Sequence, residues 1–212
     1  MPPEPSWDRV AEHYFSPRPR VRHREETIRA VLQGRSIVLQ TDAGVFARGE
    51  IDRGTALLAE SLALVPDAHV LDVGCGYGTL GILAAMLAPN GRVVMTDVNE
   101  RAVDLAARNA RTNAVPHAEA RLGAFYDPVA GEAFDAIVCN PPIRAGKEVV
   151  FRIVDGAPAH LRPGGALWFV ARTRQGARSI EARMAAAFGN CETVARGSGY
   201  RVLRSLRITR PA

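Results

Sequence analysis

Hydrophobic positions along the chain form short runs that alternate with longer, amphipathic stretches. The short runs, several of them rich in β-branched residues, predict buried strands at 69–73, 92–97, 118–122, 134–139 and 165–170. Between them, apolar residues recur at helical spacing and predict helices that begin at Thr79 and that cover 99–113, 147–161 and 179–188. Two last strands, 191–195 and 201–208, flank a hairpin signal at 197–199. Repeated strand–helix units with a final hairpin predict an α/β fold whose sheet is mostly parallel.

The first third of the chain has a different pattern. Two strand-like segments, 27–32 and 36–41, are separated by Gly34 and predict a β-hairpin. An amphipathic helix follows over 52–62, with Asp52 as its expected cap. We therefore expect residues 1–66 to form an arm, a hairpin and a helix packed on the core, and residues 67–212 to form the main domain.

The stretch 70–83 joins a strand, a glycine turn and a helix. The turn holds three glycines, which leave the backbone open to a ligand because they carry no Cβ: Gly74, Gly76 and Gly78. Thr79 is the expected cap of the helix. Residues 76–81 also match G-x-G-x-x-G, a pattern of dinucleotide sites. Asp72, inside the strand, would repel a pyrophosphate but suits a ligand that carries an amino group and a sulfonium.

Asp97 ends the next strand, about twenty residues after the glycine turn. A carboxylate there can accept hydrogen bonds from both ribose hydroxyls of a nucleoside cofactor, and Val98 would lie against the adenine. This does not distinguish S-adenosylmethionine from NAD, because both carry that ribose. Asn99 can cap the following helix by itself. Five apolar residues form its predicted inner face: Ala102, Val103, Ala106, Ala107 and Ala110.

The segment Asn140-Pro141-Pro142-Ile143 follows the fourth strand of the main domain, at the edge where open α/β sheets bind ligands. The two prolines fix the backbone and hold Asn140 in extended geometry. The Asn140 amide and the Pro141 carbonyl are then two acceptors directed at one spot. Two acceptors that hold the hydrogens of a planar amine turn its lone pair toward an electrophile. The turn therefore predicts catalysis by positioning and electrostatics, without a metal or a covalent intermediate.

These motifs together resemble the class I S-adenosylmethionine-dependent methyltransferases, and most of all the short, single-domain members of the small-subunit ribosomal RNA guanine-N2 methyltransferase family. Five segments in order carry the resemblance: 44–46, 52–54, 72–78, 97–102 and 140–147. It covers the chain from about Tyr14 to Leu206. It implies a Rossmann-like, seven-stranded sheet with a C-terminal antiparallel hairpin, S-adenosylmethionine as methyl donor, and guanine N2 of ribosomal RNA as the usual acceptor.

The resemblance also implies roles for single residues. Ten would hold the cofactor: Asp72, Gly74, Cys75, Gly76, Gly78, Asp97, Val98, Gly123, Ala124 and Asn140. Gly123 departs from the family, whose members usually carry Asp, Asn or Ser there for the adenine amino group. Either a backbone carbonyl replaces that side chain or the affinity for the cofactor is lower.

Three further residues are expected to contact the substrate: Phe46, Arg144 and Lys147. Ile143, in the catalytic turn, stands where many relatives carry an aromatic that stacks on the target base, so stacking would be weaker. Phe46 either supplies stacking instead or is a core residue. Arg144 and Lys147 either meet substrate phosphates or form a salt-bridged helix start.

Composition places few limits on these hypotheses. No apolar run approaches the roughly 20 residues of a membrane span, and the first residues lack the pattern of a secretory signal. Cys75, Cys139 and Cys191 fit neither a metal nor a disulfide spacing, so we expect a cytoplasmic protein without a metal; Cys75 and Cys139 are expected to be small fillers. Whether the protein is a monomer or a homodimer is not indicated.

Charge permits an RNA partner without establishing one. The net charge is +5 and the pI about 9.6. Four arginines within residues 18–24 either contact phosphates or belong to a solvated leader: Arg18, Arg20, Arg22 and Arg24.

The preferred hypothesis is an S-adenosylmethionine-dependent N-methyltransferase that acts on an exocyclic amine of a nucleic-acid base, above all guanine N2 of ribosomal RNA. Three alternatives stay open. The acceptor pair also fits a glutamine amide of a protein. An NAD-linked oxidoreductase is supported only by the G-x-G-x-x-G match. Ile143 and Gly123 motivate a catalytically degenerate RNA-binding module.

Overall fold

The computed structural model describes residues 17–19, 21–47, 49–142 and 146–208. In chain order the elements are β1 (Glu26–Leu32), β2 (Arg35–Thr41), α1 (Arg53–Ser61), β3 (His69–Val73), α2 (Thr79–Leu87), β4 (Arg92–Asp97), α3 (Glu100–Thr112), β5 (Ala118–Leu122), the short 3₁₀ helix η2 (Asp127–Val129), β6 (Phe134–Cys139), α4 (Lys147–His160), β7 (Leu161–Arg172), α5 (Ala177–Phe188), β8 (Glu192–Gly197) and β9 (Tyr200–Leu206). No helix in the described part of the chain is long and apolar enough to cross a membrane.

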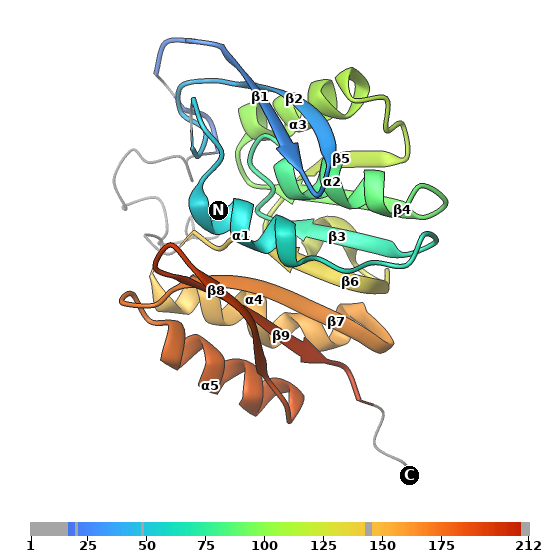
Figure 1. Ribbon diagram of the computed structural model, residues 1–212, viewed down its shortest axis with the longest axis vertical. Helices are drawn as coiled ribbons and strands as arrows, with labels where there is room; N and C mark the ends of the chain where they lie inside the picture. Colours follow the sequence, from blue (N-terminus) through green and yellow to red (C-terminus); the bar gives the residue numbers. More distant parts are fainter. Residues whose placement is uncertain (1–16, 20, 48, 143–145, 209–212) are drawn as a thin grey trace, which may run out of the picture.

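Seven strands form one sheet in the order β5-β4-β3-β6-β7-β9-β8, and β1 and β2 form a separate two-stranded sheet (Figure 1). The strands from β5 to β7 pair in parallel, whereas β9 runs antiparallel to both β7 and β8. The predicted α/β fold, with its seven-stranded, mostly parallel sheet, its C-terminal antiparallel hairpin and its N-terminal hairpin and helix, is thus confirmed.

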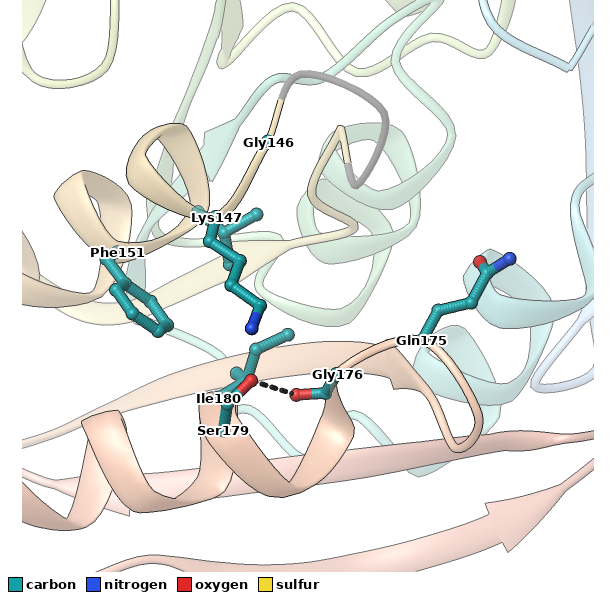
Figure 2. A pocket seen from close by; sticks show the side chains of 8 residues that line it. Gly146, Lys147, Phe151, Gln175, Gly176, Ser179 and Ile180 are labelled. Atoms are coloured by element: carbon teal, nitrogen blue, oxygen red, sulfur yellow. Dashed lines mark hydrogen bonds between the residues drawn. The ribbon is translucent and has the colours of Figure 1, made fainter.

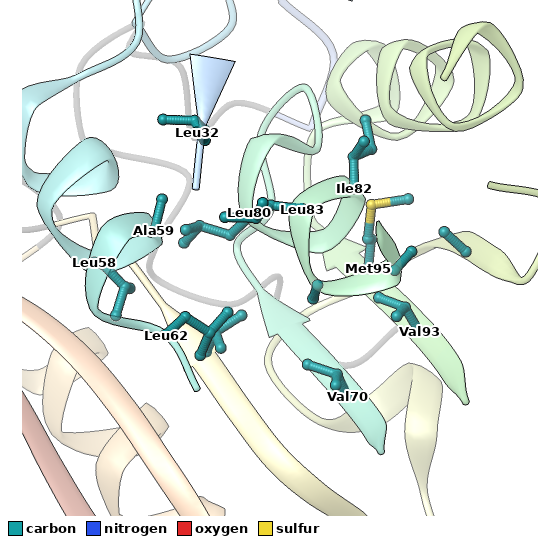
Figure 3. Close-up of a cluster of buried hydrophobic side chains, with 14 of the residues drawn as sticks. Leu32, Leu58, Ala59, Leu62, Val70, Leu80, Ile82, Leu83, Val93 and Met95 are labelled. Atoms are coloured by element: carbon teal, nitrogen blue, oxygen red, sulfur yellow. The ribbon is translucent and has the colours of Figure 1, made fainter. Parts of the chain in front are cut away.

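One face of the sheet is covered by α1, α2, α3 and the N-terminal hairpin. Figure 3 shows the centre of this layer, where Leu58 of α1 and the following Leu62 lie beside Leu80 of α2, on the side of the sheet that Val70 of β3 also faces. Because burial of one such side chain contributes about 1.5–3 kcal/mol, this layer fixes α1 firmly beside the glycine turn.

The opposite face packs on α4 and α5. Successive residues of a strand point to opposite faces, so Leu71, next to Val70, belongs to this second layer. It is joined there by Ile137 and Phe169 of the sheet and by Val154 of α4. Between β5 and β6 the chain forms only η2, so this face carries two long helices.

Side chains of α3, in place of another strand, cover the outer edge of β2. Asn113 accepts a hydrogen bond from Val38 N at 2.9 Å and donates one to Val38 O at 2.7 Å. Asn109 does the same with Gln40, at 2.7 and 2.8 Å. The two amides therefore pair the backbone groups that an edge strand leaves open, and they attach the hairpin to the main domain. The division of the chain at residue 66 stays a prediction.

The inner face of α3 was predicted in part wrongly. Its buried residues include Leu105 and Asn109, whereas Val103 and Ala107 are only half-buried. Apolar periodicity could not place Asn109 inside, because its burial depends on the unpaired backbone of β2.

Strand β7 is longer than predicted. Its first residue, Leu161, already pairs with Phe134, and the register then shifts before the next pair. Gly164 N donates to Arg207 O, and Arg207 N donates to Gly165 O, both at 2.8 Å. Residues 162–165, which the sequence left outside the predicted strand at 165–170 except for Gly165, therefore form an irregularity within β7, held by the chain that follows β9.

Both hairpins turn over two residues with positive φ, as type I′ turns require. These are Gln33 and Gly34 (φ 46° and 72°) in the first, and Ser198 and Gly199 (φ 49° and 81°) in the second. The turns set the register of both strand pairs. Strands β8 and β9 begin and end within two residues of the limits predicted for them, 191–195 and 201–208.

Candidate active site

The candidate site lies at the carboxyl ends of β3, β4 and β6. Strand β3 lies between β4 and β6 in the sheet, although the chain runs from β3 to β4 and β5 before it returns as β6. In open α/β sheets such a reversal of strand order is the usual position of the ligand crevice, so the ends of these three strands are the candidate crevice.

The glycine turn after β3 borders this crevice. Gly74 N and Cys75 N both donate to Thr96 O, at 2.8 and 3.0 Å, which holds the turn against β4. Gly74 and Gly76 have φ of 72° and 56°, and a Cβ on either would meet nothing within 4 Å. The space in front of these two glycines is therefore open to a ligand.

Gly78 allows close packing of the chain, whereas Gly74 and Gly76 leave space for a ligand. A Cβ there would lie 3.2 Å from both the Met95 Sδ and the Ala106 Cβ, and its φ is 93°. Gly78 occupies the cap position of α2 without a side-chain cap, and Thr79 is the first helical residue, so the prediction of Thr79 as cap was wrong. The physical reason is that Asp72 reaches across from β3 and accepts from Gly81 N at 2.8 Å, which satisfies one of the helix's first amides.

Asp72 carries a buried carboxyl group, and only one of its two oxygens is hydrogen-bonded to a described residue. It is 1% exposed, and its Oδ1 has no hydrogen-bond partner within the described part of the chain. Burial is the main reason that the pKa of Asp72 is raised to about 7. The negative charge of Asp97 also raises this pKa, whereas the hydrogen bond from Gly81 N lowers it. Buried polar atoms almost always have a hydrogen-bond partner, so the Oδ1 oxygen marks a place where a ligand could supply a donor or a positive charge.

Asp97 connects the glycine turn to the start of α3. Its Oδ2 accepts from Gly76 N and its Oδ1 from Asn99 N, both at 2.9 Å. Burial raises the pKa of Asp97, while the backbone hydrogen bonds, from Asn99 first, lower it. Asn99 caps α3, as expected, by accepting from Arg101 N and Ala102 N. A carboxylate has about four acceptor positions, so Asp97 can still accept from a ligand.

Three further residues predicted to bind the cofactor follow the ends of β4 and β5. Val98 and Ala124 are half-buried there. Gly123 N donates to Asp97 O at 2.9 Å. At Gly123 φ is 152°, and a Cβ would lie 2.4 Å from Pro128 Cγ. The chain at this position therefore excludes the polar side chain that the resemblance led us to expect, and Pro128 is the cause.

The turn after β6 brings Asn140 to the same crevice. Pro141 is buried and Asn140 half-buried. The Asn140 amide nitrogen donates to Thr55 Oγ1 at 2.8 Å and to Asp52 Oδ2 at 3.2 Å, so it faces α1. The amide oxygen consequently points away from α1. Pro142 is half-buried, whereas the predicted Ile143 and Arg144 lie outside the described residues.

Lys147 lines a pocket of about 400 Å³ between the first turns of α4 and α5. Figure 2 shows its side chain extending from the start of α4 toward Gly176 and Ser179, with the Phe151 ring beside it. In the sequence, Gly146 and Lys147 follow the Asn140 turn after residues 143–145, which lie outside the described part of the chain. Phe46 is half-buried on the loop between β2 and α1.

The thiols near the site are poor nucleophiles. Cys75 is half-buried and Cys139 is buried, and burial raises the pKa of both well above the ordinary value. The thiol form dominates at neutral pH, which fits their predicted role as small fillers. No group of three or more histidine, cysteine or acidic residues placed to hold a metal ion occurs among the residues that the structure describes.

Part of the basic arm contacts the chain itself. Arg18 pairs with Glu100 at 2.9 Å, and Arg24 lies 3.6 Å from Glu26. Pro17 O accepts from Glu100 N at 3.0 Å. Arg20 lies outside the described residues. The arm therefore lies along the start of α3, near Asp97, at least through residues 17–19.

Sequence patterns did not reveal several contacts of this site. Asp52 was expected only as a cap, and neither Thr55 nor Tyr200 was singled out, although all three lie around the Asn140 amide or its partner. No local signal could have shown these contacts, because α1, β9 and the turn after β6 come together only in the folded chain.

The chain matches a known protein family and is similar to several known proteins. The family described as "Methyltransferase small domain" matches residues 36–204. The uncharacterized protein YbxB of Bacillus subtilis is 34% identical over 202 residues, 94% of this chain and 100% of that protein. Ribosomal RNA small subunit methyltransferase C of Pseudomonas entomophila is 34% identical over 77% of this chain, but the chain spans only 49% of that protein.

A solved structure is also similar. It is the 16S rRNA N2 G1207 methyltransferase of T. thermophilus, in complex with AdoMet and guanosine. The TM-score is 0.78 at 28% identity, over 86% of this chain and 50% of that one. The chain thus spans about half the length of the methyltransferases with an assigned activity that it matches.

Proposed function

Since the chain belongs to the methyltransferase small domain family, we propose that it transfers the methyl group of S-adenosylmethionine to an exocyclic amine of a nucleic-acid base. The proposed acceptor is guanine N2 of ribosomal RNA. The similar T. thermophilus enzyme, whose structure holds AdoMet and guanosine, supports this substrate. We also propose a cytoplasmic location and an RNA partner, as predicted from the sequence.

The residues of the crevice fit S-adenosylmethionine. The open space before Gly74 and Gly76 admits a ligand against the backbone, and the orphaned Oδ1 of Asp72 can accept a hydrogen bond from an ammonium group. Asp97 would accept from the ribose, with Val98 and Ala124 beside the adenine. S-adenosylmethionine supplies a methyl group on a positively charged sulfur. Asp72 suits that charge and would repel the pyrophosphate of NAD, whereas Asp97 fits the ribose of either cofactor.

The observation that carries the proposal is the orientation of Asn140. Because its amide nitrogen is bound to Thr55 and Asp52, its oxygen is the group turned toward the crevice. Together with the Pro141 carbonyl it would accept both hydrogens of a flat amine. Such an amine is a weak nucleophile because its lone pair is shared with the ring, and the two acceptors draw it toward the tetrahedral form. Lys147 and Phe46 are proposed to contact the surrounding RNA.

A transfer assay with methyl-labelled S-adenosylmethionine tests the substrate class. Purified small ribosomal subunits and their extracted RNA are offered separately, and the product is treated with ribonuclease or with protease. We expect ribonuclease to release the label, and hydrolysis of the RNA to yield N2-methylguanosine. Label released by protease would support the glutamine-amide alternative instead, and label in N6-methyladenosine would refute guanine N2. Absence of turnover, with cofactor still bound, would support the degenerate module.

A further inference from the structure

The orientation of an asparagine amide depends on its neighbours, because the oxygen and nitrogen have nearly the same shape. Thr55 alone cannot fix the orientation of the Asn140 amide, since a hydroxyl group can donate to the amide oxygen or accept from the amide nitrogen. Asp52 can fix this orientation, because an ionised carboxylate only accepts hydrogen bonds. With the Asn140 amide reversed, two oxygens would face each other at the position of the present 3.2 Å contact.

Asp52 is itself held on several sides. Its Oδ2 accepts from Gly54 N at 2.9 Å and from Thr55 N at 3.2 Å, which fixes the carboxylate at the start of α1. Its Oδ1 accepts from the Tyr200 hydroxyl at 3.2 Å. The cap of α1 and the partner of Asn140 are therefore the same side chain.

Tyr200 is oriented by Arg172, its partner across β7 and β9. Arg172 Nε donates to the Tyr200 hydroxyl at 2.8 Å, and its guanidinium lies 5.2 Å from the ring centre. Since arginine only donates, the tyrosine hydroxyl must accept from it and direct its own hydrogen to Asp52. Gly54 permits this approach, because a Cβ there would lie 2.7 Å from the Tyr200 ring.

From these contacts we propose that Asp52 and Thr55, supported by Tyr200 and Arg172, are positioning residues that fix the Asn140 amide with its oxygen toward the target amine. The inference rests on the proposed function for the identity of that amine. The orientation itself is a property of the chain alone and can be measured without substrate.

Kinetics of matched variants test the effect on catalysis. Asp52→Asn keeps a good helix cap but can donate as well as accept, so it no longer enforces one orientation. We expect kcat to fall about 10- to 100-fold in Asp52→Asn and in Thr55→Val, with the Kd for S-adenosylmethionine and the KM for RNA changed less than about twofold. Thr55→Ser should restore most of the activity, because it keeps the hydroxyl. Tyr200→Phe should lower kcat by a smaller factor.

Glu60→Gln is the control for the helix. It makes the same carboxylate-to-amide change on α1, at an exposed residue that accepts from Gln33 N at 2.9 Å, and should leave kcat unchanged. Unchanged kcat in Asp52→Asn would overturn the proposal. A loss matched by weaker cofactor binding or by unfolding would do the same, because a structural role predicts it.

A ¹H–¹⁵N spectrum separates this inference from the proposed function. The side-chain NH₂ pair of Asn140 is identified by its absence in Asn140→Ala. We expect this pair to shift in Asp52→Asn and Thr55→Val, and to stay in place in Glu60→Gln and Thr55→Ser. If the wild type transfers no methyl group to RNA, the proposed function fails, yet the spectrum still decides the orientation. A pair that is unmoved in Asp52→Asn overturns the inference, whatever the substrate.

Discussion

Replacing Asn140 with alanine is expected to lower kcat for methyl transfer by about 10²- to 10³-fold, the usual effect of removing one preorganised polar group from a reacting centre. The amide oxygen of Asn140 is the acceptor that the Thr55 and Asp52 contacts turn toward the crevice. Without it, Pro141 alone would hold the amine. Because we propose that the methyl donor binds mainly at the β3 and β4 ends, its Kd should change less than about tenfold. Single-turnover assays and calorimetry measure the two quantities.

Asn90→Ala is the matched control for that variant. Asn90 is exposed in the turn before β4, at the opposite end of the strands, where its backbone N donates to Pro66 O. Its replacement should leave kcat and Kd unchanged. Full turnover by Asn140→Ala would show that the turn after β6 does not act on the amine.

The second large effect is expected at Asp72, and it depends on pH. The pKa of Asp72 is raised by burial to about 7 in the folded chain, against 3.8 for a solvent-exposed aspartate side chain. Between these values the folded state holds a proton that the unfolded state has lost. The stability of the cofactor-free protein should therefore fall as pH rises from about 4 to about 7, and then level off. Thermal unfolding across this range measures the slope.

Binding of S-adenosylmethionine should show the opposite trend. Its cationic groups favour the ionised form of Asp72, so affinity should rise as pH rises toward 7. Asp72→Asn keeps an acceptor for Gly81 N but cannot ionise. It should weaken binding by about 1.5–3 kcal/mol, roughly 10- to 150-fold, and should remove most of both pH trends. Asp97, whose pKa is also raised by burial, leaves a residual slope. Equal slopes in Asp72→Asn and the wild type would contradict the role given to Asp72.

Local patterns were sufficient to predict the sheet and the position of the crevice. Buried strands such as β3 and β6 are short apolar runs, and the glycine turn and the Asn-Pro-Pro turn each follow one of them directly. Since parallel strands share one carboxyl edge, both turns had to meet there. The family resemblance added the cofactor and the substrate class, which no spacing alone could supply.

Contacts between distant elements could not be predicted in the same way. The two partners of the Asn140 amide, Asp52 and Thr55, lie 88 and 85 residues away in the sequence. Gly123 was predicted to bind the cofactor without the polar side chain of its relatives, and only the structure shows that a Cβ there would lie 2.4 Å from Pro128 Cγ. Asn109 was not among the predicted inner-face residues of α3, yet it is buried and pairs the edge of β2. Each case depends on what packs against a residue, and a hydrophobic pattern does not contain that information.

In the proposed function, Asn140 and Pro141 together hold a flat amine against the methyl donor. A crystal structure with guanosine and a non-transferable analogue of S-adenosylmethionine tests it most directly. We expect the guanine N2 to lie about 3 Å from both the Asn140 Oδ1 and the Pro141 carbonyl oxygen, with the analogue before Gly74 and Gly76. An amine bound elsewhere, or an Asn140 amide with its oxygen turned to Asp52, would contradict the account.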